Sequence, residues 1–294
     1  MNFAELESHL KARKIPIAIC KPENSETVTA AMEASDQGYV ECAFVGNGSV
    51  MQALLNRIAP GFKPRIIHAS TEEEAAAKAV GLVRDGTAEA IVKGTLSTPV
   101  FLKAILNSEL GIKKGKVLSH VLVYEWEGSF KFLTDGGMIP HPTLEEKFEI
   151  IKNAVEFARR LGCEKPRVAV LSAVETVSFK MQSSIDAAVL AKMGERGQIT
   201  GCTIDGPLAL DNAISLESAH HKGLSNEVVG KADILIAPDI DTGNILGKTI
   251  LYFGKIPAGG VILGAAVPVV MLSRSDNKQT RLNSLKLAFA GGPG

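Results

Sequence analysis

Residues 231–274 read KADILIAPDIDTGNILGKTILYFGKIPAGGVILGAAVPVVMLSR. An apolar strand pattern at 234–236 runs into a polar turn at 238–244, a short helical stretch follows, and a second apolar run ends at Ser273 and Arg274. Strand, polar turn, helix and strand in this order are typical of α/β enzymes, whose ligands bind at the carboxyl ends of the strands. Both polar ends of this segment are therefore candidates for binding a small anion.

The same alternation continues outward along the whole chain. Short β-branched runs predict strands at Ile15–Cys20, Cys42–Gly46, Arg65–His68, Ala90–Val92, Leu118–Tyr124, Val168–Leu171, Ile234–Ala237 and Val261–Leu263. Helical patterns lie between them, including Glu72–Arg84, Thr98–Leu106, Leu144–Leu161 and Ile185–Met193. Alternating strands and helices indicate crossover connections and a mainly parallel sheet.

Length and composition favour two domains. The chain has 294 residues, of which 46% are hydrophobic and only 5% aromatic, so aliphatic side chains must fill sheets that helices cover on both faces. The stretch DGGMIPHPT (135–143) is rich in glycine and proline and precedes the best-defined helix, with Thr143 and Glu146 as its capping box. A second change falls near 268–274. We therefore expect a first domain of 1–140 plus 270–294 and a second of 141–269.

Charge and cysteine usage exclude several function classes. The 32 basic residues balance the 32 acidic ones, which argues against nucleic acid or an anionic membrane as a partner. The opening MNFAELESHLKARK lacks the apolar centre of a signal peptide, and the apolar run at 256–272 is too interrupted to span a bilayer. The separated cysteines suit a reducing cytoplasm and indicate neither a metal site nor disulfides: Cys20, Cys42, Cys163 and Cys202.

A polar loop after one predicted strand offers anion-binding groups. Lys93, Ser97 and Thr98 belong to the run KGTLSTP (93–99), in which Pro99 suits the first position of a helix. A lysine, hydroxyls and helix-opening amides then occur together, which is a pattern that binds anions. The alternative is a capped turn without a ligand.

The two ends of the opening segment also have competing interpretations. Thr242, Gly243 and Asn244 form a turn whose glycine and asparagine tolerate unusual backbone angles, before helix amides that could bind an anion. The following Gly-Lys-Thr lacks the first glycine of a phosphate-binding P-loop, so we do not expect nucleotide hydrolysis. Arg274 with Ser273 could hold phosphate, or could cap a helix at the surface.

Several ordered motifs together resemble one known family. They are SAVETVSFKMQSSIDAAVLAKM (172–193), CTIDGPLALDNAIS (202–215), ADILIAPDIDTGNILGKTILYFG (232–254) and LSRSDNKQTRLNSLKLA (272–288). In these motifs the chain resembles the phosphate acetyl/butyryltransferase family, and the segment AHHKG and the run YFG are similar to its butyryl branch. The similarity extends from Ile15 to Ala288.

The resemblance implies an enzyme that moves a short acyl group, butyryl or similar, between coenzyme A and phosphate. We expect direct attack in a ternary complex, because no cysteine or serine of this chain has an evident activating base. It also implies two α/β/α domains of the isocitrate/isopropylmalate dehydrogenase type with the active site in the cleft between them. Coenzyme A is then a substrate or product rather than a permanently bound cofactor. A homodimer or larger homo-oligomer is expected, and no metal.

The resemblance further implies site residues, because Ser273 with Arg274, Ser97 with Thr98, and Asn244 match positions of the family's site. Together with further polar and turn residues of this chain, the catalytic candidates are Ser273, Arg274 and Asp276, and the substrate-binding candidates are Lys93, Ser97, Thr98, Asp135, Lys180, Thr242, Gly243 and Asn244. The acetyl branch has an aspartate, proposed to deprotonate the thiol of coenzyme A, where this chain has Thr280. Asp276 or another group would then be the base.

Two rival functions stay open from the sequence. A metal- and NAD-dependent dehydrogenase of the same broad fold would use Asp205, Asp239 and Asp241 as metal ligands. A non-catalytic module that binds coenzyme A or an acyl phosphate is the other. The sequence does not rank acyl chain lengths, since the residues that line the acyl pocket cannot be identified from one chain.

Overall fold

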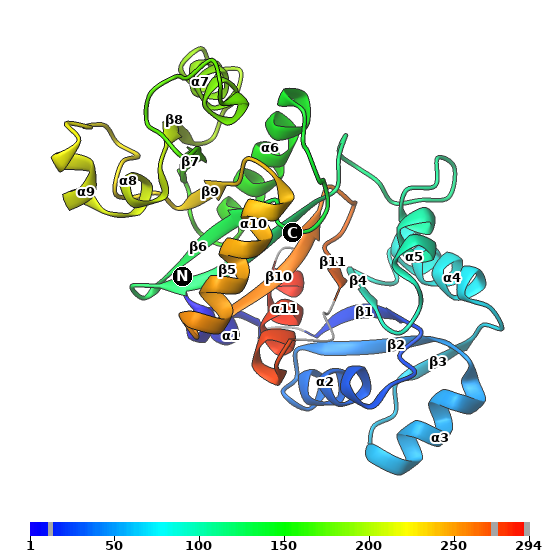
Figure 1. Ribbon diagram of the computed structural model, residues 1–294. Coiled ribbons are helices and arrows are strands. Elements are labelled where there is room, and N and C mark those ends of the chain that lie inside the picture. Colours follow the sequence, from blue (N-terminus) through cyan, green and yellow to red (C-terminus); the bar gives the residue numbers. More distant parts are fainter. Residues whose placement is uncertain (11–13, 272–275, 291–294) are drawn as a thin grey trace. The chain divides into compact units, whose positions relative to one another are not determined.

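Two compact units make up the chain in the computed structural model, which describes residues 1–10, 14–271 and 276–290 (Figure 1). The N-terminal unit comprises Phe3–Lys114 and Gly259–Gly294, and the central unit comprises Met1–Asn2 and Gly115–Ala258. Each unit is built around its own mainly parallel strands.

In the N-terminal unit the strand order is β3-β2-β1-β4-β11-β10. These strands are β1 (Ile15–Cys20), β2 (Val40–Gly46), β3 (Arg65–His68), β4 (Ala90–Lys93), β10 (Ala258–Leu263) and β11 (Val269–Met271). Neighbours pair in parallel except β10 with β11, which pair antiparallel. The helices of this unit are α1 (Phe3–Leu10), α2 (Ser25–Asp36), α3 (Gly48–Ile58), α4 (Glu72–Arg84), α5 (Thr98–Ile105) and α11 (Lys278–Ala290).

The order of these strands creates a switch point between β1 and β4. The chain runs from β1 outward to β2 and β3, then returns through α4 to place β4 on the other side of β1. Connections that leave two adjacent parallel strands in opposite directions open a crevice at their carboxyl ends, where ligands of open α/β sheets bind. Lys21 follows β1 and Gly94 follows β4 at this point.

In the central unit the strand order is β5-β6-β9-β7-β8. The strands are β5 (Ser119–Trp126), β6 (Ser129–Thr134), β7 (Arg167–Leu171), β8 (Thr203–Leu208) and β9 (Ile234–Ile236). β5 and β6 form an antiparallel hairpin, and the other neighbours are parallel. The helices are α6 (Leu144–Arg160), α7 (Gln182–Glu195), α8 (Leu210–Ile214), α9 (Leu216–His221) and α10 (Ile240–Lys248), with a π-helical turn at Thr249–Phe253.

Helix α6 shows how local sequence sets these elements. The Thr143 hydroxyl accepts a hydrogen bond from the Glu146 backbone N–H at 3.2 Å, and the Glu146 carboxylate accepts one from the Thr143 backbone N–H at 2.8 Å. This confirms the predicted capping box. Phe157 on the buried face of α6 meets Phe132 of β6 edge to face, with ring centroids 6.5 Å apart.

The predicted α/β architecture with mainly parallel strands is confirmed, and strands β6, β8 and β11 are additions to the strands expected from the sequence. The units change at 114/115 and 258/259, whereas the sequence placed the changes at 140/141 and 269/270. The first of these differences arises because β6 pairs with β9, which draws the β5–β6 hairpin into the central unit. Among the helices described, none has the length and apolar character needed to cross a membrane.

Candidate functional site

A pocket of about 570 Å³ lies at the β1–β4 switch point of the N-terminal unit. Three of the predicted substrate-binding residues, Lys93, Ser97 and Thr98, line it together. The remaining lining residues are Asn24, Glu26, Thr27, Glu72, Gly94, Thr95, Leu96 and Arg281. The structure therefore brings the predicted loop to the place where an α/β sheet binds its ligands.

The loop from Lys93 to Thr98 owes its course to close contact with the end of β1. The Gly94 backbone N–H donates to the Cys20 carbonyl oxygen at 2.7 Å, and the Thr95 N–H donates to the Lys21 carbonyl oxygen at 2.8 Å. A Cβ at position 94 would lie 2.6 Å from the Cys20 carbonyl oxygen, so only glycine fits. Ser97 then occupies the N-cap of α5 without capping it through its side chain, and a proline follows in the first turn.

The described residues that line this pocket include charges of both signs. Lys93 and Arg281 are the cations among them, and Glu26 and Glu72 are the carboxylates. Arg281, from α11, is a residue that sequence reasoning missed. Its position depends on where the C-terminal helix packs, and no local motif marks it. With the hydroxyls of Ser97 and Thr98, the pocket can bind a phosphate group through charged and neutral donors.

The predicted residues of the central unit gather at the carboxyl ends of β6 and β9. Asp135 follows β6, is 2% exposed, and accepts hydrogen bonds from the backbone N–H groups of His120, Gly137, Met138 and Ile139 at 2.8–3.2 Å. Burial raises the pKa of this carboxyl, although the backbone donors at Gly137 and then His120 act in the opposite direction. The Asp135 side chain therefore holds the turn that follows β6.

Thr242, Gly243 and Asn244 lie in the first turns of helix α10, not in the irregular turn that was predicted. The helix begins earlier because Asp239 is its N-cap and accepts from the Thr242 backbone N–H at 2.8 Å. Gly243 is buried against the backbone of Asp135 and Gly136. A glycine is needed here because the two backbones approach closely, and not because the position requires unusual backbone angles. Asn244 and Thr242 are exposed.

The other predicted residues fall in three places. Lys180 lies exposed just before α7, with its backbone N–H 3.4 Å from the Ser178 hydroxyl. Ser273 and Arg274 lie outside the described residues. Asp276 is half-buried just before α11, and Thr280 is buried within that helix. The parallel register pairs Met271 at the end of β11 with Lys93 at the end of β4.

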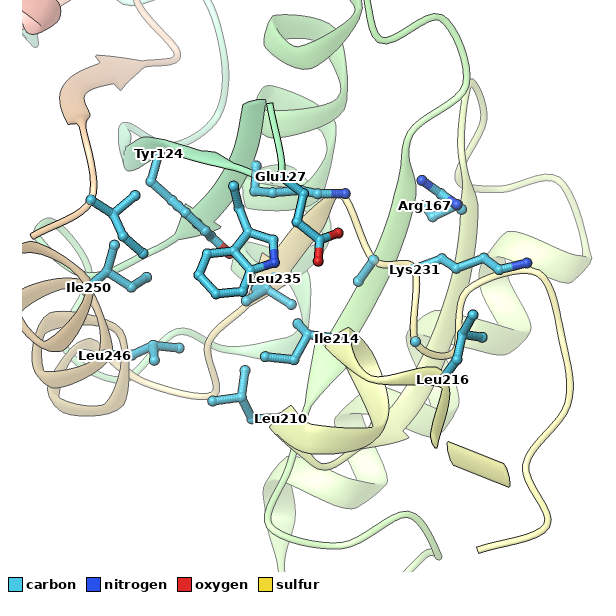
Figure 2. Close-up of a pocket in the computed structure, with 15 residues that line it drawn as sticks. Tyr124, Glu127, Arg167, Leu210, Ile214, Leu216, Lys231, Leu235, Leu246 and Ile250 are labelled. Atoms are coloured by element: carbon cyan, nitrogen blue, oxygen red, sulfur yellow. The ribbon is translucent and has the colours of Figure 1, made fainter. Parts of the chain in front are cut away.

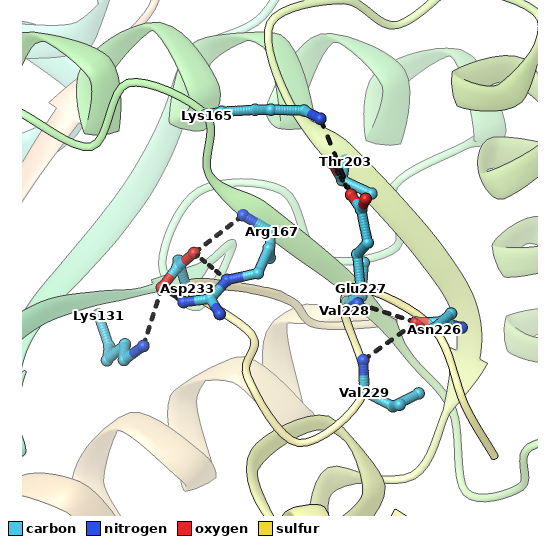
Figure 3. A network of polar contacts seen from close by, with 9 residues as sticks. All are labelled: Lys131, Lys165, Arg167, Thr203, Asn226, Glu227, Val228, Val229 and Asp233. Carbon is cyan, nitrogen blue, oxygen red and sulfur yellow. Dashed lines mark hydrogen bonds and ion pairs between the residues drawn. The ribbon is translucent and has the colours of Figure 1, made fainter.

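A second pocket, of about 340 Å³, lies in the central unit and is mainly apolar (Figure 2). Tyr124, Leu235 and Ile250 contribute to its lining, and Arg167 lies at its polar side. Asp233 accepts from the Arg167 Nε at 2.8 Å and from the Lys131 Nζ at 2.8 Å (Figure 3). None of the predicted site residues that the structure describes lines this pocket.

Neither an activated thiol nor a metal site is found in the part of the chain that the structure describes. Burial raises the pKa of Cys20 and of Cys42 to about 12, and that of Cys202 to about 11. No three His, Cys, Asp or Glu side chains cluster as metal ligands among the described residues. Asp205, one of the ligands required by the dehydrogenase interpretation, accepts a hydrogen bond from Asn226 instead.

Comparisons with known proteins converge on one group of enzymes. A family model described as phosphate acetyl/butaryl transferase matches residues 49–289. The chain is 40% identical over 291 residues to the phosphate butyryltransferase of Clostridium acetobutylicum, covering 98% of this chain and 97% of that protein. It is 39% identical over 274 residues to the phosphate acetyltransferase of Rhizobium meliloti, with 92% and 86% covered. A crystal structure of a branched-chain phosphotransacylase from Enterococcus faecalis matches with a TM-score of 0.83 and 34% identity, covering 94% of this chain and 98% of that one.

Proposed function

Because the chain belongs to the phosphate acetyl/butaryl transferase family, we propose that it moves a short acyl group between coenzyme A and inorganic phosphate. The reaction is acyl-CoA + phosphate ⇌ acyl phosphate + CoA. The observation that carries the proposal is the nearly full-length similarity to phosphate butyryltransferase. The relatives include enzymes named for butyryl, acetyl and branched-chain acyl transfer, so the acyl group is short and its preferred length is the open variable.

We assign the phosphate group to the pocket at the β1–β4 switch point. Phosphate carries about 1.5 negative charges near neutral pH, and Lys93 and Arg281 supply two cations there. The hydroxyls of Ser97 and Thr98 add neutral donors at the start of α5, where the helix dipole favours an anion. Ser273 and Arg274 remain proposed members of the same site, on the strength of the resemblance.

In the acyl-CoA direction, a phosphate oxygen attacks the thioester carbonyl carbon. The carbon–oxygen bond forms, the carbon–sulfur bond breaks, and coenzyme A leaves as a thiolate that takes up a proton. In reverse, the thiol must lose its proton before it attacks, since alkyl thiols such as that of cysteine, with a pKa of about 8.5, are mostly protonated at neutral pH. Asp276 is our candidate base, because Thr280 carries no ionisable group at the place of the acetyl-branch aspartate.

The cysteine thiols of this chain favour direct transfer in a ternary complex over an acyl-enzyme. An acyl-enzyme would need a nucleophile with a lowered pKa or a neighbouring base. The Cys20 thiol, which lies at the end of β1, has a raised pKa and is fully buried. Holding both substrates in one site makes their reaction effectively unimolecular without covalent catalysis.

Further expectations accompany this function. Asp135, Lys180, Thr242, Gly243 and Asn244 are proposed to contribute to binding on the central unit. Coenzyme A acts as substrate and no permanent cofactor is required. Three more proposals rest on the resemblance. The protein forms a dimer or larger homo-oligomer, and it has a cytoplasmic location. Its two units are of the dehydrogenase-like type, with a substrate site to which both contribute.

The test is a thiol-release assay with acetyl-, propionyl-, butyryl- and isobutyryl-CoA, each with and without phosphate. We expect release of free thiol that requires phosphate and produces one equivalent of acyl phosphate. Binding of acyl-CoA without turnover would support a non-catalytic binding module and end the proposal. Exchange of label between acyl-CoA and CoA in the absence of phosphate would replace direct transfer with an acyl-enzyme.

A further inference from the structure

Lys21 has an unusual backbone conformation for a lysine. Its φ angle is +53°, in the left-handed region that residues other than glycine seldom adopt. Its carbonyl oxygen accepts hydrogen bonds from the Thr95 N–H at 2.8 Å, the Thr95 hydroxyl at 3.0 Å and the Glu23 N–H at 2.9 Å. The surrounding structure therefore holds this residue in a conformation of higher energy, as is typical of functional sites.

The Lys21 side chain is also fixed. Its Nζ lies 2.9 Å from Oε1 of Glu72, the first residue of α4, and 4.0 Å from a carboxylate oxygen of Glu23. The second oxygen of Glu72, Oε2, accepts the Ser97 backbone N–H at 2.9 Å. The Glu72 carboxylate thus links the two segments that follow β1 and β4: Oε1 contacts Lys21 after β1, and Oε2 contacts Ser97 after β4.

Glu72 is suited to accept hydrogen bonds rather than to act as a base. The Ser97 backbone N–H is the main cause that lowers the pKa of Glu72, and Lys21 is the second. The N-terminal end of α4 also favours a negative charge at this position. The carboxylate therefore stays ionised over the pH range in which the transferase would work.

The turn that Glu72 contacts at Ser97 also carries the residues that we propose to bind phosphate. Ser97 starts α5, and its neighbours Thr98 and Lys93 line the same pocket. A displacement of the Ser97 backbone moves the hydroxyl donors of Ser97 and Thr98 together, since they belong to one tight turn. Small displacements of such donors are expected to weaken the binding of an anion strongly.

We propose that Glu72, fixed by Lys21, is a positioning residue that sets the Lys93–Thr98 turn for binding the phosphate group. This inference rests on the proposed function, because it assigns the phosphate to that pocket. Lys21 holds the Glu72 carboxylate, and the Glu72 carboxylate holds the Ser97 backbone N–H. The loss of either Lys21 or Glu72 should therefore have the same consequence for the turn.

The test compares Glu72→Gln, Lys21→Met and the double variant with wild type, and uses Glu73→Gln as a matched control. Glu73 is the exposed neighbour of Glu72 on the same helix. We expect each single variant to raise the KM for phosphate about tenfold, the scale of one charge-assisted hydrogen bond. The KM for acyl-CoA and the melting temperature should stay near those of Glu73→Gln. The double variant should be no worse than either single one, because residues that act as a unit are not additive.

Glu72→Asp provides a second comparison, since it keeps the charge but shortens the reach by one methylene group. A positioning role predicts that it also raises the KM for phosphate. Normal phosphate kinetics in both Glu72 variants would overturn the inference, as would equal increases in both KM values with a lowered melting temperature.

A readout that does not need turnover separates this inference from the proposed function. Inorganic phosphate should raise the melting temperature of wild type and of Glu73→Gln, and raise it less in Glu72→Gln. If phosphate raises the melting temperature of wild type more than that of Glu72→Gln, but wild type catalyses no acyl transfer, the proposed function fails and the inference stands. If acyl transfer occurs and Glu72→Gln matches Glu73→Gln in both assays, the inference fails and the function stands.

Discussion

Asn244 donates a hydrogen bond from its side-chain Nδ2 to the carbonyl oxygen of Gly136 at 3.1 Å, 108 positions away along the chain. Next to it, Gly243 packs directly on the turn that follows β6. A Cβ built at Gly243 would lie 2.5 Å from the Asp135 carbonyl oxygen and 2.8 Å from the Gly136 Cα. The first turns of α10 and the β6 turn therefore depend on one another for their positions.

Gly243→Ala should destabilise the protein. The added methyl group meets backbone atoms, which cannot move aside as a flexible side chain does, so we expect a loss of about 1–3 kcal/mol in the free energy of unfolding. Gly81→Ala in helix α4 is the control, because a Cβ there meets nothing within 4 Å. It should be neutral or stabilise by about 0.5–1 kcal/mol through helix propensity. Chemical denaturation of both variants checks the opposite signs, and equal effects would contradict the packing argument.

Asp233 should make stability depend on pH at the acidic end. Burial alone would raise the pKa of this carboxyl, but hydrogen bonds from Arg167 and Lys131 outweigh burial and lower it (Figure 3). A carboxyl with a lowered folded-state pKa contributes stability above its unfolded value of about 3.9. That contribution is lost as the pH falls through the folded-state pKa.

The variant Asp233→Asn should therefore lower the free energy of unfolding at pH 7 by about 3–5 kcal/mol, since it leaves two cations beside a buried neutral group. The difference from wild type should shrink as the pH falls below about 4. Denaturation curves between pH 7 and pH 3 measure it, with exposed Glu164→Gln as the control. A difference that does not change with pH would mean that the Asp233 charge is not what stabilises the fold.

Cys20 should be dispensable for acyl transfer. Burial first, and the charge of Glu72 second, raise the pKa of this thiol to about 12, so its thiolate is scarce near neutral pH. We expect Cys20→Ala to keep kcat within about threefold of wild type, because direct transfer needs no thiolate of the protein. Steady-state kinetics with butyryl-CoA measure this. A loss of about a hundredfold or more in a variant with an unchanged melting temperature would point to an acyl-enzyme.

Local signals explain which parts of the fold could be predicted. Helix α6 was expected at Leu144–Leu161 and spans Leu144–Arg160, since its cap and its apolar face are both local. Strand β8, with sequence TIDGPL, carries a glycine and a proline that usually argue against a strand. Strand β11 has only three residues, and its pairing with β4 depends on contacts distant in sequence. Neither of these strands has a local pattern strong enough to predict it.

The candidate site follows the same division. Lys93, Ser97 and Thr98 could be predicted because one loop carries them all between a strand and a helix. Arg281 and Glu72 could not, since each reaches the pocket from another helix and is surrounded in sequence by ordinary helical residues. Asp135 is a candidate that no local motif marks, and its four backbone contacts become visible only when the turn after β6 is folded.

Arg281 offers the sharpest check on where phosphate binds. Its side chain lines the pocket together with Lys93, so its guanidinium should contact the anion through a planar fork of donors. We expect Arg281→Gln to raise the KM for phosphate about tenfold or more, the scale of a lost charged hydrogen bond. Arg281→Lys should fall between that variant and wild type, because it keeps the charge but loses the fork.

The matched control for Arg281 is Lys278→Gln, from the first turn of the same helix. The Lys278 side chain is exposed and pairs with Glu33 at 2.6 Å, away from the residues that line the pocket. Losing it removes one positive charge from α11 without changing the pocket, so the KM for phosphate should stay within about twofold of wild type. Equal increases in the two variants would mean that the positive charge of α11 acts at long range. In that case raising the ionic strength should abolish both effects, whereas a direct contact by Arg281 should persist in salt.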